Sequence, residues 1–258
     1  MKKIIYYSDE LNDEFSGSNI IPRKIDENYK YIHKNIFWNI QSFLIQNVLS
    51  VPLKYLYAKI KFKIRYIGKE KYKPYKKQGY FIFGNHTQVF ADTFITSNGN
   101  YPKRNYFIVN PENVSMKFLG NIVEMFGAIP IPSNLEAMKN FLEAIKYRIQ
   151  KGNSITIFPE AHIWPYYTKI RPFKAVSFKY PVQLNAPSFC VTNTYQSYGK
   201  NNNKVRLVSY IDGPFFSDES CKTMKEKQQN LRDKIYSQMC KRAENSNIEV
   251  IEYRKIKE

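Results

Sequence analysis

Two short polar segments of this chain carry side chains that could perform acid–base chemistry. The first, residues 85–92, contains His86 and Asp92 and directly follows an apolar run. The second, residues 158–160, ends another apolar run with Glu160. Imidazole titrates near neutral pH, and a nearby carboxylate can fix the orientation of the ring. Together, His86 and Asp92 therefore predict a general base that removes a proton from a hydroxyl group.

Simpler explanations of these residues stay open on spacing alone. The histidine and the aspartate could form an ordinary surface or core pair. Asp92 could cap a helix while another acid contacts His86, and Glu160 could be a carboxylate at a helix start. With four or five intervening residues, the two side chains would lie about 140° or 240° apart on a helix. A catalytic pair at this spacing therefore requires a turn, and a turn can accommodate one additional residue.

Alternating short strands and helices are predicted to position the two segments. Apolar runs predict strands at residues 80–83, 106–109, 154–158, 188–192 and 205–211. Apolar residues at helical spacing predict helices at residues 115–126, 135–150, 173–184 and 217–243. Ser217 is predicted to begin the last of these helices. This alternation predicts an α/β fold whose sheet is covered on both faces, with both polar segments just past strand ends, where such sheets bind ligands.

The first 65 residues differ from the rest of the chain. Residues 1–30 are mixed in charge and predict a poorly ordered or surface-laid arm. Residues 31–65 predict two amphipathic helices separated at Pro52, of which the second is cationic. Their polar residues and the proline disfavour a bilayer span and favour helices lying in the membrane surface. A helix pair that only packs on its own domain is the alternative. The main domain is then residues 66–258.

The charge of the chain predicts an anionic partner. The net charge is +18, and residues 51–80 hold ten Lys or Arg residues but one acid, Glu70. Such a patch attracts phospholipid headgroups, nucleic acid, coenzyme A or an acidic carrier protein. The three scattered cysteines form neither a disulfide framework nor a metal cluster, which indicates a reducing cytosolic compartment and no structural zinc. The N-terminal apolar run is too short for a signal peptide.

With two further motifs, the polar segments resemble the lysophospholipid acyltransferase superfamily, the glycerolipid acyltransferases related to bacterial 1-acylglycerol-3-phosphate acyltransferases. That family has Asn-His-x₄-Asp, Gly-x-Ile-x-Ile-x-Arg, Phe-Pro-Glu-Gly and a Pro-led apolar strand. The matching segments here, in the same order, are residues 85–92, 127–133, 158–161 and 187–191. The resemblance covers roughly residues 35–215. It implies a single domain with a mixed, mostly parallel sheet flanked by helices, and an N-terminal helical element that docks on the membrane.

The chain departs from the family pattern at four positions. Five residues separate the histidine from the aspartate, where the family usually has four, and Ala161 replaces the glycine after the glutamate. Ser133 and Ile163 stand where the family has basic residues. In the family, those basic residues hold the phosphate of the acyl acceptor. The catalytic half of the resemblance is therefore stronger than the half that recognises the acceptor.

The resemblance assigns roles to the polar residues. His86 would be the general base, Asp92 would orient it, and Glu160 would bind the glycerol hydroxyl of the acceptor. The surrounding candidates for binding the oxyanion or assisting are Asn85, the backbone amides after His86, Thr87 and Gln88. If the acceptor carries a phosphate, the candidate ligands are Lys169, Arg171 and Lys174, with Arg104 and His162 behind them. A solvated helix start is the alternative explanation of Arg171 and Lys174.

The sequence therefore predicts an acyltransferase at the cytoplasmic face of a membrane. It would move a fatty acyl group from acyl-CoA or acyl carrier protein to the hydroxyl of a lysophosphatidate-like lysolipid. No metal or cofactor is expected, because a thioester is already activated. The vacant basic positions favour, as an alternative, an acceptor without that phosphate, such as an amino-acid or glycosyl lysolipid. A lipid-binding protein without catalysis is another alternative. Nucleic-acid binding is disfavoured by the lack of a nucleic-acid motif, and a serine hydrolase by the lack of a Gly-x-Ser-x-Gly elbow.

Overall fold

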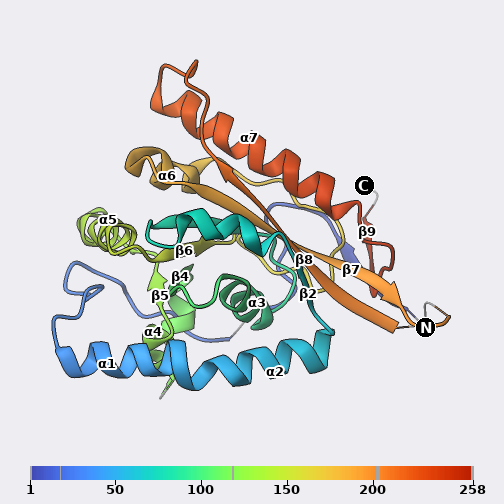
Figure 1. The fold of residues 1–258 in the computed structure, drawn as a ribbon, viewed down its shortest axis with the longest axis horizontal. Helices are drawn as coiled ribbons and strands as arrows, with labels where there is room; N and C mark the ends of the chain where they lie inside the picture. Colours follow the sequence, from blue (N-terminus) through green and yellow to red (C-terminus); the bar gives the residue numbers. More distant parts are fainter. Residues whose placement is uncertain (1, 18, 118, 202–203, 257–258) are drawn as a thin grey trace.

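The computed structural model describes residues 2–17, 19–117, 119–201 and 204–256, and in these ranges a seven-stranded sheet has helices on both faces (Figure 1). The strand order is β2-β8-β7-β3-β6-β4-β5. The bounds are β2 Arg65–Ile67, β3 Tyr80–Gly84, β4 Asn105–Val109, β5 Ala128–Pro130, β6 Ser154–Ile157, β7 Ser188–Tyr198 and β8 Lys204–Phe215. Neighbouring strands are parallel except β7 and β8, which are antiparallel. The predicted α/β fold with a mostly parallel sheet is therefore confirmed.

The central strand β3 is buried on both faces, as its unbroken apolar sequence predicts. Phe81 and Phe83 pack in the core beneath the helices of one face, while Tyr80 and Ile82 pack in a cluster on the other. All five predicted strands are present, but β7 and β8 continue as a hairpin well beyond the predicted ends. The three-residue strands β2 and β5 were not predicted, because such short edge strands carry almost no periodic signal.

Helices α5 Leu135–Gln150, α6 Lys179–Leu184 and α7 Met224–Ala243 cover one face. The predicted helix at 217–243 begins later than expected, because Thr223 and Glu226 form a capping box and Ser217 does not cap it. The predicted helix at 173–184 is a 3₁₀ turn, Val176–Phe178, followed by α6. These corrections concern helix starts and leave the layer as predicted.

The opposite face carries α3 Ala91–Asn100, a helix that was not predicted, with the N-terminal helices beyond it (Figure 1). The predicted helix at 115–126 is shorter in the structure. A 3₁₀ turn, Pro111–Val114, precedes α4 Gly120–Met125. Phe118, which falls within that predicted helix, lies outside the described residues.

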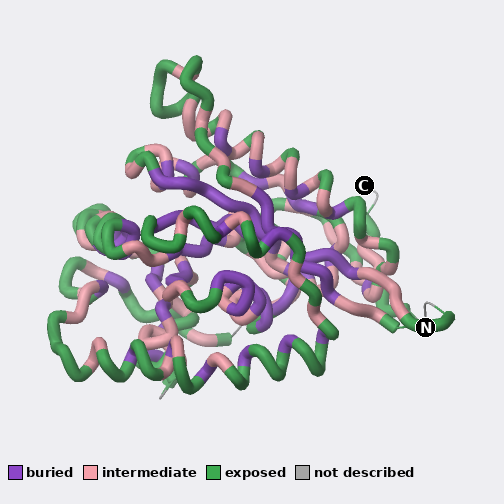
Figure 2. Tube along the Cα trace, viewed as in Figure 1, coloured by how far each residue is buried: buried purple, intermediate pink, exposed green. Residues whose placement is uncertain are grey.

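The N-terminal helices form one rod in which Pro52 does not end the helix, contrary to the prediction. Helix α1 Ile36–Leu44 continues through a π-helical turn, Ile45–Leu49, into α2 Ser50–Phe62. Pro52 lies in the first turn of α2, where a residue without an N–H is tolerated. Beside this turn, the Gln46 carbonyl accepts from Ser50 Oγ at 3.0 Å and from Lys54 Nζ at 3.2 Å. Figure 2 shows that most residues along this rod are exposed. Within the described ranges, no helix has both the length and the apolar character to cross a bilayer.

Two strands far apart in the sequence pair beside the main sheet. Strand β1 Lys3–Tyr7 runs parallel to β9 Ile251–Lys255. After β1, the chain crosses the loop that follows Glu160, where the Trp164 indole N–H donates to the Asp13 carbonyl at 2.8 Å. Much of the segment predicted as an arm is therefore attached to the main domain.

Asp212 on β8 is a buried carboxylate that stabilises the fold in a pH-dependent way. Burial alone would raise the pKa of Asp212, but hydrogen bonds from Arg242, at 2.7 and 2.8 Å, and from Lys71, at 2.6 Å, lower it to about 2. A lowered folded-state pKa gives stability that is present above the unfolded pKa and is lost as the pH falls through the folded value.

Asp212→Asn is expected to lower the free energy of unfolding by about 2 kcal/mol at pH 7. Below about pH 4, the difference from the unmodified protein should shrink and vanish near pH 2. Urea unfolding at several pH values measures this. Asp218→Asn, which removes an exposed pair with Lys234, is the control and should change little. A loss that is the same at every pH would contradict the assignment.

Candidate active site

The predicted catalytic residues lie where three neighbouring strands place them. Strand β3 lies between β6 and β7 and is parallel to both. Asn85 and His86 follow the end of β3, and Glu160 follows the end of β6. The register pairs Gly84 with Val191, so that the next residues of β7 lie beside His86. This sheet edge is therefore the candidate active site.

His86 and Asp92 are in contact. The distance from His86 Nδ1 to Asp92 Oδ2 is 2.9 Å, which is hydrogen-bond range. The imidazole stacks on the Phe158 ring, with a centroid distance of 4.4 Å and an interplanar angle of 13°. Gly84 makes room for this stack, because a Cβ there would lie 2.8 Å from the Phe158 ring. The contact predicted from the sequence is present, and Asp92 does not serve only as a helix cap.

The turn between the two residues accommodates the additional residue through hydrogen bonds to one oxygen. Besides the imidazole, Asp92 Oδ2 accepts the backbone N–H of Thr87 at 2.7 Å and of Gln88 at 2.8 Å. Asp92 itself is buried in the first turn of α3. The carboxylate thus holds the ring and the turn together. These two amides are engaged, so they do not form the oxyanion site predicted for the backbone after His86.

Two residues on β7 complete the support and were missed by the sequence analysis. Asn193 donates from Nδ2 to Asp92 Oδ1 at 3.1 Å. The Tyr195 hydroxyl donates to Thr87 Oγ1 at 2.8 Å. Asn85, a predicted oxyanion donor, instead clamps the Asn193 backbone, with its Oδ1 accepting the N–H at 2.8 Å and its Nδ2 donating to the carbonyl at 3.0 Å. The alternation of β7 could have revealed Asn193, since it follows Phe189 and Val191 on the same face, but the predicted strand ended too early.

Glu160 joins the turn that follows β3 to the segment around Arg171. Its Oε2 accepts the His86 N–H at 2.8 Å, and its Oε1 accepts the Arg171 N–H at 2.9 Å. Glu160 is 4% exposed, and burial raises the pKa of its carboxyl, an effect that Arg171 and the two N–H groups partly oppose. Both oxygens thus face protein donors. The sequence analysis expected this carboxylate to face a glycerol hydroxyl.

Arg171 lies in a different setting from the one predicted. Its side chain is 1% exposed and donates to the Glu10 carbonyl at 3.1 Å, the Glu160 carbonyl at 3.2 Å and the His162 carbonyl. The guanidinium also lies 4.9 Å from the centre of a Trp164 ring. Arg171 was predicted to bind a phosphate, but three backbone carbonyls and an indole already surround it. In this structure it fixes the loop that carries Glu160.

The other predicted acceptor residues are spread apart. His162 is bonded through Nδ1 to Glu14 at 2.7 Å, and Lys174 is exposed. Arg104 lies elsewhere, since its Nε donates to Gln46 Oε1 at 2.6 Å beneath the N-terminal rod. Ser133, which stands at the vacant basic position of the family, accepts the Ile25 N–H through its hydroxyl.

Ala161 has a backbone φ of 64°, a conformation that glycine adopts more easily. The position therefore suits the glycine that the family has there. Alanine occupies it at a cost of about 1 kcal/mol.

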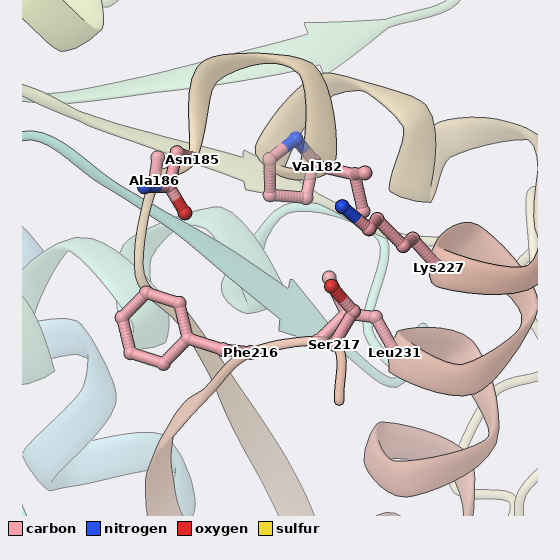
Figure 3. A pocket seen from close by; sticks show the side chains of 8 residues that line it. Val182, Asn185, Ala186, Phe216, Ser217, Lys227 and Leu231 are labelled. Atoms are coloured by element: carbon pink, nitrogen blue, oxygen red, sulfur yellow. The ribbon is translucent and has the colours of Figure 1, made fainter. Parts of the chain in front are cut away.

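One surface hollow lies away from the dyad. A hollow of about 260 Å³ is lined by residues of α6, the segment just after β8 and the first turns of α7, among them Val182, Phe216 and Lys227 (Figure 3). Its lining residues Asn185 and Ala186 just precede β7, at the sheet edge where β3 begins. His86 follows the other end of β3, so this hollow is separate from the candidate site.

Comparison with known proteins agrees with the fold and with the motifs at this sheet edge. The family model for Acyltransferase matches residues 63–193, just over half of the chain, a range that includes His86, Asp92 and Glu160. The fold is similar to the crystal structure of the 1-acyl-sn-glycerophosphate (LPA) acyltransferase, PlsC, from Thermotoga maritima. The TM-score is 0.52 at 15% sequence identity, and the match covers 79% of this chain and 86% of that one. At that identity the likeness concerns the fold alone. No curated protein matches the sequence. The extent of the family match shows that this chain belongs to the acyltransferase family.

Proposed function

We propose that this acyltransferase moves a fatty acyl group from a thioester, acyl-CoA or acyl carrier protein, to the hydroxyl of a lysolipid. His86 is the general base and Asp92 its orienting partner. The observation that carries the proposal is the contact of 2.9 Å between His86 Nδ1 and Asp92 Oδ2. Asn193, at 3.1 Å from Oδ1, holds the second oxygen of the same carboxylate. A ring fixed in this way presents Nε2 to a substrate.

The proposed reaction uses the two ring nitrogens differently. Nδ1–H of His86 donates to Asp92, so Nε2 can take the proton of the acceptor hydroxyl while the hydroxyl oxygen bonds to the thioester carbonyl carbon. The carbonyl electrons move to the carbonyl oxygen and form a tetrahedral intermediate. When it collapses, the C–S bond breaks and the leaving thiolate takes the proton from the imidazolium. Asp92 stabilises the imidazolium between the two steps. The scheme includes no metal or redox cofactor, because the thioester is already activated.

The first candidate acceptor is a lysophosphatidate-like lysolipid, as the family motifs suggest. A second candidate, an acceptor without phosphate such as an amino-acid or glycosyl lysolipid, is favoured by specific observations. Ser133 and Ile163 occupy the basic positions of the family, and Arg171 donates to three backbone carbonyls. Lys169 and Lys174 are then the exposed cations left from the predicted set near Glu160.

An acceptor panel separates the two candidates. Thiol release from acyl-CoA and from acyl carrier protein would be measured with lysophosphatidate and with lysolipids that lack the phosphate. If lysophosphatidate is the acceptor, Lys174→Gln is expected to raise its KM by about tenfold and leave the donor KM nearly unchanged. Lys225→Gln, on α7 at the far sheet edge, is the matched control. Equal KM values in Lys174→Gln and the unmodified protein, with faster turnover of a phosphate-free lysolipid, would favour the second candidate. Transfer to no lysolipid would overturn the proposed function.

The proposed place of action is the cytoplasmic face of a membrane, with residues 31–65 as the docking element. The supporting observation is the large number of exposed apolar side chains on the N-terminal rod. They include Ile36, Phe37, Ile40, Phe43, Val48, Leu49, Leu53, Leu56 and Ile60. In the described part of the chain, Lys59, Lys61 and Lys63 at the end of the rod form no ion pair with an acid. Apolar residues beside unpaired lysines suit the boundary between acyl chains and anionic headgroups.

A further inference from the structure

The turn between His86 and Asp92 has its polar groups on the inside. The backbone N–H groups of Thr87 and Gln88 donate to the Asp92 carboxylate. Their side chains are buried and bond to the Tyr195 hydroxyl, at 2.8 Å for Thr87 and 2.9 Å for Gln88. The polar side chains at the start of the turn are therefore paired within the protein and do not face water.

The outward part of the same turn is apolar. Val89 is 47% exposed and Phe90 is 65% exposed. Surface turns ordinarily expose Gly, Asn, Asp or Ser, whose side chains bond to the backbone or to water. A single exposed apolar residue requires no explanation. Here two consecutive ones stand between the predicted catalytic residues, in the segment that is one residue longer than in the family pattern. The turn thus has the polarity expected of a segment that faces a non-aqueous surface.

The turn lies next to the end of the proposed docking rod. Phe62 of α2 belongs to the same buried cluster as Ala91, the residue that follows Phe90. Five residues before Phe62, the Tyr57 ring lies 6.0 Å from the ring of Phe94 on α3. The exposed apolar residues of α2 and those of the turn therefore belong to neighbouring elements.

We propose that Val89 and Phe90 enter an anionic lipid bilayer together with the end of α2, so that the catalytic turn is itself a membrane contact. The proposal rests on the proposed function, because it takes the acceptor to be a lipid in that bilayer. The acceptor would then reach His86 along the membrane surface without passing through bulk water. The turn would act in substrate delivery, and its apolar side chains would take no part in proton transfer.

Charge identifies the bilayer as the occupant of this surface. At the end of the rod, close to Phe62, Lys59, Lys61 and Lys63 form no ion pair with an acid in the part of the chain that the structure describes. A second copy of the chain would bring the same excess charge and would be repelled. Apolar side chains flanked by cations match a layer with acyl chains below and anionic headgroups above.

Tryptophan fluorescence tests the contact without requiring acyl transfer. Phe90→Trp would be made with Trp38→Phe, so that Trp164, which is fully buried, remains as an internal reference. On phosphatidylcholine/phosphatidylglycerol vesicles that contain brominated lipid, the new indole is expected to be quenched. The control is Phe216→Trp in the same background, because Phe216 is an exposed aromatic residue at the opposite sheet edge. It should stay unquenched.

A second measurement links the contact to lipid delivery. Val89→Ser with Phe90→Ser is expected to lower the ratio of turnover on vesicle-borne lysolipid to turnover on a short-chain, water-soluble lysolipid by about tenfold. Phe216→Ser should leave that ratio unchanged. Phe90→Trp, which keeps a large apolar ring, should also preserve it.

Three outcomes would overturn the proposal. The first is an unquenched new indole in Phe90→Trp protein that pellets with the vesicles. The second is a fluorescence shift that follows protein concentration in the absence of lipid, which would assign the turn to a contact between two copies. The third is an equal loss of turnover on both forms of lysolipid, which would place Phe90 inside the substrate site. If instead the indole is quenched but no lysolipid is acylated, the proposed function fails and the membrane contact stands.

Discussion

His86→Ala is expected to lower acyl transfer by roughly three or more orders of magnitude while the protein stays folded. The substitution removes the group that accepts the hydroxyl proton. It also removes the ring that stacks on Phe158 and that Asp92 holds in place. The substitution therefore removes the general base and the contacts that position it in one step. Thiol release from the acyl donor, measured at saturating acceptor, gives the effect on kcat.

His33→Ala is the matched control for this substitution. His33 also stacks on an aromatic ring, that of Trp38, with a centroid distance of 3.7 Å. It precedes the N-terminal rod, however, and is not part of the predicted dyad. The control should keep most of the activity. Near-normal turnover by a folded His86→Ala protein would refute the mechanism.

Asp92→Asn is expected to lower kcat by about two to four orders of magnitude. The carboxylate oxygen Oδ2 accepts from His86 and from two backbone N–H groups, while Oδ1 accepts from Asn193. An amide has one oxygen, so it cannot accept at both sites. The new amide NH₂ would then point either at the N–H groups of the turn or at Asn193 Nδ2, and in both cases two donors would face each other. The ring would then lose both its fixed tautomer and the charge that stabilises the imidazolium.

A milder variant separates orientation from folding. Asn193→Ala removes the contact to Oδ1 and leaves the three to Oδ2, so it should reduce kcat by about tenfold. Far-ultraviolet circular dichroism and the melting temperature would show whether each variant is folded. If folded Asp92→Asn protein keeps kcat within a factor of three, His86 does not depend on Asp92.

The sequence was sufficient to predict the central strands and the His86–Asp92 contact. The predicted strands at 80–83 and 106–109 are continuous apolar runs and the other three are mostly apolar. Such runs form buried strands in a covered sheet. His86 and Glu160 each follow one of these runs, and parallel strands place their carboxyl ends at one edge. The additional residue before Asp92 did not prevent the contact, because hydrogen bonds from the turn to Oδ2 hold the longer segment.

Helix α3 could not be predicted from its own residues. Its sequence, ADTFITSNGN, contains threonine, asparagine and glycine, which are weak helix formers. The helix is stabilised instead by packing, since Ala91 and Ile95 share a buried cluster with Phe62 and Tyr195. Those partners come from distant parts of the chain. Local propensity was therefore overridden by tertiary contacts that a single sequence does not display.

The setting of Arg171 was also beyond local sequence reasoning. A basic residue shortly after the Phe-Pro-Glu segment resembles a phosphate ligand. The neighbouring sequence gives no indication of the direction in which its side chain points. The carbonyl of Glu10, one of the three that Arg171 contacts, comes from the opposite end of the chain. That segment was predicted to be an arm, so no partner for the guanidinium was expected there.

The pairing of β1 with β9 has a consequence for when the protein becomes active during its synthesis. Residues 3–7 are made early, yet their strand partner at 251–255 is made last among the described elements. The ring of Tyr253 on β9 stacks on Trp164 at 5.1 Å and its hydroxyl donates to the Pro165 carbonyl, within the loop that follows Glu160. At about 5–20 residues per second, β9 leaves the ribosome well after the dyad. The nascent chain is therefore expected to carry a complete dyad beside an uncovered Glu160 loop, and to gain full activity only after β9 has been released.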